Sequence, residues 1–154
     1  MNFKSLAISA LLAIAATPAL AQEAPKLFFE GDVVRAAGPT AKGAWCVLNS
    51  QFKRGETAIF RIRVLDPKTG KSLDEKGVKS LVVELSNGEK LGVNYHQHPP
   101  KDPTDWFWVA GWPIAENQPT GSLSYKVVAN TLDGQTVTWR PFQVANSQLT
   151  VIGD

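Results

Sequence analysis

Apolar and polar residues alternate with a period of two along most of the chain. Across residues 57–65, Phe60, Ile62 and Val64 fall on one face of an extended chain, and arginines occupy the positions between them. Because successive side chains of a β-strand point to opposite faces, this pattern predicts a strand with one face in a core and the other in water. The same alternation recurs at residues 80–85, 122–129 and 135–140. Half-buried strands of this kind are typical of antiparallel sheets.

Turn-forming residues separate these strands. Asn87-Gly88 and Asp133-Gly134 are two-residue hairpin signals, because these residue types tolerate positive φ. Weaker apolar stretches predict further strands at residues 27–34, 45–49, 90–95, 106–112 and 148–152. Eight or nine short strands with regularly spaced turns predict an all-β fold, a single antiparallel β-sandwich.

The order of these turns and strands resembles that of bacterial immunoglobulin-like and fibronectin-III-like domains. The matching phrases are Phe52-Lys53-Arg54-Gly55-Glu56-Thr57, Val64-Leu65-Asp66-Pro67-Lys68-Thr69-Gly70, Pro119-Thr120-Gly121 ahead of Tyr125, and Asp133-Gly134. They fall within residues 50–145 and are turn and strand patterns rather than catalytic signatures. Cys46 has no second cysteine to pair with, unlike the cysteines of antibody domains. The resemblance implies the fold and a binding or structural role, and it transfers no functional residues.

The N-terminal residues have the pattern of an export signal. Lys4 precedes an apolar run at residues 6–16, which is shorter than the roughly 20 residues of a membrane helix. Ala19-Leu20-Ala21 matches a small-residue cleavage site, so residues 1–21 are expected to be removed and the mature domain to span residues 22–154. No later segment predicts a membrane helix. We expect a periplasmic protein, with full secretion as the second possibility.

Composition limits the class of partner and the means of stabilisation. Removing 21 of 154 residues leaves 133, enough for one domain with its own core. The formal net charge is +2, and no block of like charge runs along the chain, so nucleic acid is not an expected partner. Cys46 is the single cysteine, which rules out an intramolecular disulfide.

The segment that joins two of the predicted strands holds both histidines. His96 and His98 would project from the same face of a strand, roughly 6.5–7 Å apart. Such a pair can bind copper or zinc with a third ligand, for which the Cys46 thiolate and the carboxylates of Asp102 and Asp105 are candidates. The simpler interpretation is that the histidines are polar loop residues and Cys46 lies in the core. A blue-copper site fits poorly, because residues 22–154 contain no methionine as axial ligand.

An aromatic run follows the histidines. On a strand, Trp106, Trp108 and Trp112 share one face and Phe107 takes the other. If exposed, these four side chains would form a patch for a protein partner or a sugar, since aromatic rings supply large rigid contact areas. If buried, they would be part of the core.

Catalytic motifs are absent from the sequence, which contains no Gly-x-Ser-x-Gly, no His-Glu-x-x-His and no phosphate-binding glycine loop. We therefore expect a non-enzymatic, exported β-sandwich that acts as a protein-binding or accessory subunit of a periplasmic complex, without a cofactor. Its expected binding residues are Trp106, Phe107, Trp108 and Trp112. The alternative is a periplasmic copper- or zinc-binding protein that uses His96 and His98, with Cys46 as a further ligand. Carbohydrate binding by the tryptophans is a weaker third possibility.

Overall fold

The computed structural model describes residues 26–44, 46–141 and 149–153, and within them the chain is all-β. Strands in this part of the chain are β1 (Phe28–Arg35), β2 (Gln51–Lys53), β3 (Thr57–Leu65), β4 (Val78–Leu85), β5 (Lys90–His98), β6 (Asp105–Pro113), β7 (Gly121–Leu123), β8 (Tyr125–Thr131), β9 (Thr136–Trp139) and β10 (Leu149–Ile152). None of these residues belongs to a helix with the length and hydropathy to cross a bilayer. The all-β prediction is confirmed, whereas the expected signal peptide at residues 1–21 lies outside the described residues.

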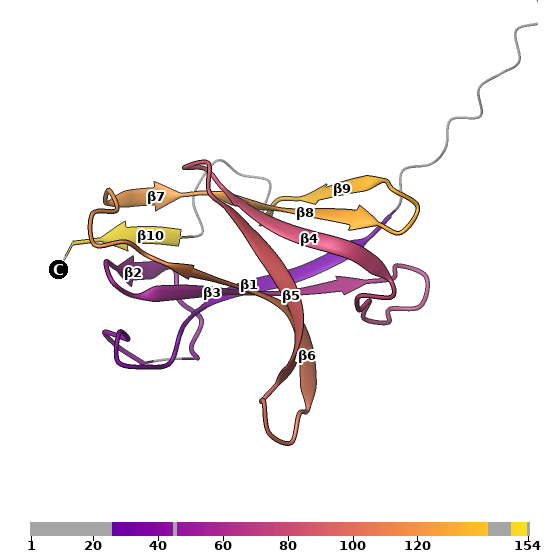
Figure 1. Ribbon diagram of the computed structural model, residues 1–154, viewed down its shortest axis with the longest axis horizontal. Helices are drawn as coiled ribbons and strands as arrows, with labels where there is room; N and C mark the ends of the chain where they lie inside the picture. Colours follow the sequence, from indigo (N-terminus) through magenta and orange to yellow (C-terminus); the bar gives the residue numbers. More distant parts are fainter. Residues whose placement is uncertain (1–25, 45, 142–148, 154) are drawn as a thin grey trace, which may run out of the picture.

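Seven strands form one antiparallel sheet in the order β1-β3-β6-β5-β4-β8-β9, which curls around the core (Figure 1). The curl depends on β5. Residues 90–93 of this strand pair with β4, and residues 94–98 pair with β6. Because β5 changes its partner half-way along, it belongs to both parts of the sheet and links them.

The two edge strands of the curled sheet meet. Phe29 of β1 stacks on Trp139 of β9, with ring centroids 5.7 Å apart and planes 8° from parallel. A Cβ atom at Gly31 would lie only 2.8 Å from the Trp139 indole. The missing side chain of Gly31 therefore lets β1 and β9 approach each other closely.

The core lies on the concave side of this sheet. Ala58, Phe60, Ile62 and Val64 of β3 are buried in alternation with half-buried positions, as the sequence pattern predicts. Tyr125 of β8 contacts the Phe60 ring edge-on, with centroids 4.9 Å apart. Residues from β3 and β8, at opposite parts of the sheet, thus share one core.

A second sheet of three strands has the order β2-β10-β7, with β10 parallel to β2 and antiparallel to β7. Phe52, Leu149 and Val151 from this sheet are buried in the same core cluster. Its β2 is joined to β3 by a turn in which Gly55 has a φ of 76° and donates its N–H to the Ile114 carbonyl.

Two of the expected strands differ in the structure. The prediction of a strand at 45–49 is wrong for residues 46–49, in which Leu48 makes an isolated bridge with Val34 and no strand forms. Residue 45 lies outside the described residues. The strand expected at 122–129 divides at Ser124, because β7 pairs with β10 and β8 pairs with β4. Hydrogen bonds between Ser124 and Ser86 hold the chain at the point where it passes from one sheet to the other.

The contact between β1 and β9 generates a stability prediction. Gly31→Ala places a Cβ against the Trp139 ring, so we expect it to lower the free energy of unfolding by about 1–3 kcal/mol through overpacking. Gly92→Ala on β5 is the matched control, because a Cβ there meets nothing within 4 Å. Urea unfolding of both variants measures the difference. Equal stabilities would contradict the role given to Gly31.

Candidate functional site

The β5–β6 hairpin extends away from the two sheets (Figure 1). Its connecting loop, residues 99–104, contains three of the prolines of the chain, and the His98–Pro99 peptide bond is cis. Thr104 donates its N–H to the His98 carbonyl at 3.1 Å. The Gln97 side-chain amide donates to the Pro100 carbonyl at 2.6 Å. These bonds fix the loop to the end of β5.

The three tryptophans expected to bind a partner differ in their exposure to solvent. Trp108 and Trp112 are only 2 % and 1 % exposed and belong to the core. Their indole N–H groups are satisfied inside the protein, by the Leu73 carbonyl at 2.8 Å and the Glu89 carboxylate at 2.9 Å. The predicted surface patch from Trp106 to Trp112 is therefore not continuous, because Trp108 and Trp112 are buried in the core.

Trp106 is the member that remains accessible, with 44 % of its surface exposed. Its ring stacks on Tyr95 of the neighbouring strand, with centroids 5.5 Å apart and planes 19° from parallel. Tyr95 also contacts Trp108, at 5.4 Å, so Trp106 and Trp108 lie on the same side of the hairpin. The stacked pair presents a rigid aromatic surface next to the core.

Phe107 points to the other side of the hairpin, where two arginines of β3 pack over its ring. The guanidinium carbon of Arg61 lies 5.4 Å from the ring centroid and that of Arg63 lies 4.8 Å from it. His98 approaches the same ring edge-on at 6.0 Å. Phe107 is thus held by cation–π contacts and is half-buried.

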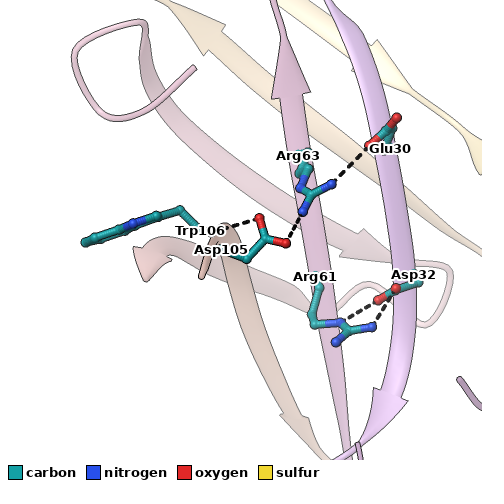
Figure 2. A network of polar contacts seen from close by, with 6 residues as sticks. All are labelled: Glu30, Asp32, Arg61, Arg63, Asp105 and Trp106. Atoms are coloured by element: carbon teal, nitrogen blue, oxygen red, sulfur yellow. Dashed lines mark hydrogen bonds and ion pairs between the residues drawn. The ribbon is translucent and has the colours of Figure 1, made fainter. Parts of the chain in front are cut away.

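Acidic side chains of β1 and β6 pair with both arginines (Figure 2). Arg61 makes two hydrogen bonds of 2.7 Å to the Asp32 carboxylate. Arg63 makes a short contact with Asp105 and a longer one of 3.7 Å with Glu30. The ion pairs run across β1, β3 and β6 and tie the start of β6, next to the hairpin loop, to the sheet.

A groove opens where β3 and β6 part. Their pairing ends at Ile62 and Trp108, after which the rest of β3 stays with β1 and the start of β6 stays with β5. The space between them, which we name the fork groove, has a volume of about 490 Å³. Its lining comprises Glu30, Arg63, Leu65, Gly70, Ser72, Tyr95, Thr104, Asp105 and Trp106.

The expected metal ligands line a different groove of about 290 Å³ on the Phe107 side. His96, His98 and Cys46 all border it, together with an apolar floor that includes Ile59 and Val109. Cys46 is exposed, so the interpretation that it lies in the core is wrong. Within the described residues, no three His, Cys, Asp or Glu side chains are close enough together to hold a metal ion. The groove brings the three candidates to one surface without forming a complete ligand set.

Sequence reasoning missed the ion pairs that fix the hairpin. The signal was present: two acidic residues, Glu30 and Asp32, stand two positions apart, as do Arg61 and Arg63. On adjacent antiparallel strands such sets can pair in order, and the structure pairs Glu30 with Arg63 and Asp32 with Arg61 in register. Only the strand pairing shows that they meet.

No protein-family model matches the chain, and no curated protein matches it either. The contacts of the hairpin are therefore the basis for a functional conclusion.

The Asp105 carboxylate generates a pH prediction. The hydrogen bond from Arg63, together with the Trp106 N–H and the nearby His98, outweighs desolvation and lowers the pKa of Asp105 below its usual range. A lowered pKa in the folded state means that the interaction stabilises the hairpin above the unfolded pKa of about 3.9 and is lost as the pH falls through the folded pKa. We expect protonation of Asp105 to shift the Trp106 amide resonance only in this acidic pH range.

Asp105→Asn should give an altered Trp106 resonance already at neutral pH, without the acidic transition. Asp133→Asn is the control, because that carboxyl group also has a lowered pKa but lies in the β8–β9 turn. If Asp105→Asn left the Trp106 titration as it is in the wild type, the assignment to Asp105 would be wrong.

Proposed function

We propose that the protein is a non-enzymatic binding protein of the bacterial periplasm that attaches to a partner protein through the β5–β6 hairpin. The observation that carries the proposal is the exposed Trp106 ring, stacked on Tyr95 at the base of a projecting loop. Tryptophan and tyrosine anchors dominate the energetics of protein interfaces. A ring already held in place loses little conformational entropy on binding.

The state of the charged groups supports recognition rather than acid–base catalysis. Arg61 is bonded to Asp32 and Arg63 to Asp105. Groups committed to such pairs position other side chains, whereas a general acid or base must exchange a proton with a substrate. We therefore assign these residues the role of holding Trp106 and Phe107 in their orientations.

The export signal expected at residues 1–21 supports a location outside the cytoplasm. The curled antiparallel sheet with its shared core is compatible with a β-sandwich, and we propose the immunoglobulin-like arrangement as its class. Domains of this class commonly carry binding loops at the ends of their strands. The loop at residues 99–104 occupies such a place.

Trp106→Ala tests the proposal. Immobilised protein is incubated with periplasmic extract of its native host, and the captured proteins are quantified. We expect the amount of specifically captured protein to fall about tenfold or more for the variant, as it does when a hot-spot side chain is removed. Leu132→Ala is the matched control, because Leu132 is a large apolar side chain 61 % exposed in the β8–β9 turn. Full capture by Trp106→Ala, or a strictly solitary wild-type protein, would refute the proposal.

Binding of copper or zinc by His96 and His98 is a second candidate function. It is favoured by one observation, that both imidazoles and Cys46 border the same groove. We expect a copper(II) titration followed by absorption spectroscopy to saturate at one ion, and a His96→Ala, His98→Ala double variant to lose the signal. Unchanged spectra on adding metal, or equal binding by the double variant, would remove this candidate.

A further inference from the structure

The fork groove combines two kinds of surface. At one end is Trp106, which stacks on Tyr95. At the other end is Glu30 of β1, and Figure 2 shows the Arg63–Asp105 pair between Trp106 and Glu30. Its volume of about 490 Å³ falls within the roughly 300–1,000 Å³ of small-ligand sites. The groove can therefore receive an occupant with one apolar and one polar part.

The charges of the lining are not balanced. Two carboxylates, Glu30 and Asp105, face a single guanidinium, that of Arg63. The Asp105 carboxylate is occupied, since one oxygen accepts from Arg63 and the other from the Trp106 N–H at 3.1 Å. Among the described residues, the one polar contact of the Glu30 side chain is that of 3.7 Å with Arg63, and this side chain is 60 % exposed. The surplus negative charge thus lies at Glu30 and favours a cation.

Arg63 does not move easily toward Glu30. Its guanidinium packs over the Phe107 ring at 4.8 Å and is bonded to Asp105. These two contacts hold the arginine on the hairpin side of the groove. Glu30 consequently keeps acceptor capacity for a positively charged group that comes from outside the molecule.

We propose that the fork groove binds a short extended segment of the partner protein, with an apolar side chain on the Trp106–Tyr95 stack and a lysine or arginine beside Glu30. This inference rests on the proposed function and specifies the chemistry of the partner. In an extended segment, residues two apart project from the same side, roughly 6.5–7 Å from each other. A peptide with an apolar and a basic residue two positions apart is therefore the simplest probe of the two ends of the groove.

Blocked pentapeptides test this chemistry without the natural partner. The probe is N-acetyl-Ala-Leu-Ala-Arg-Ala-amide, followed by the Trp106 indole resonance of isotope-labelled protein. We expect saturable shifts at Trp106, with affinity reduced about fivefold or more when citrulline replaces arginine or alanine replaces leucine. Glu30→Gln should lower the affinity for the arginine peptide to that for the citrulline peptide. Glu116→Gln, which removes the same charge beyond the other end of β6, should leave the affinity unchanged.

The outcomes separate this inference from the proposed function. If Trp106→Ala abolishes capture of the partner while Glu30→Gln changes neither capture nor peptide affinity, the inference is overturned and the proposed function stands. If the peptides bind as expected while Trp106→Ala captures normally, the groove recognises this peptide chemistry, but the partner does not use it, and both the proposed function and the assignment of the segment to the partner are refuted. Shifts of Trp106 by a neutral oligosaccharide such as cellopentaose, without a response to the peptides, would overturn the inference in favour of a sugar site.

Discussion

The change of partner along β5 is the constraint on which the rest of the structure depends. Its first residues complete the part of the sheet that contains β4, and its last residues complete the part that contains β6. One strand therefore links two parts of the sheet that share a core. Its second half leaves with the start of β6 and forms the hairpin, so the separation of β6 from β3 and the fork groove between them have the same origin.

A second constraint is the buried carboxylate of Glu56, which holds the segment that carries Cys46. Burial would raise the pKa of Glu56, but hydrogen bonds from the backbone N–H groups of Lys53 and Lys42, with the Arg35 guanidinium, lower it below its usual value. Arg35 Nε lies 2.7 Å from the carboxylate. A buried charge with several donors is costly to disturb. Glu56 thus connects β1 and β2 with the segment between them, from which Ala36, Ala37 and Cys46 line the groove beside His96 and His98.

The sequence was sufficient for properties that depend on neighbouring residues. Alternation at residues 57–65 predicted the buried face of β3, and Trp106 and Trp108 share a side of the hairpin as a strand requires. The sequence was insufficient for properties that depend on contacts between segments far apart in the chain. Burial of Trp112, exposure of Cys46 and the division of a strand at Ser124 depend on which strands pair and where the pairing stops. Local periodicity carries no information on that choice.

The difference between Trp106 and Trp108 shows how the fold exposes one ring and buries its neighbour on the same side of a strand. Both rings contact Tyr95, but the pairing of β6 with β3 includes Trp108 and ends there. Trp108 is covered because β3 continues beside it, and its indole N–H bonds to the Leu73 carbonyl. Trp106 lies two residues away, beyond the last residue of β6 that pairs with β3, and remains open to solvent. The exposed Trp106 ring is thus supported by the core through Tyr95, which contacts both tryptophans and packs against the buried cluster.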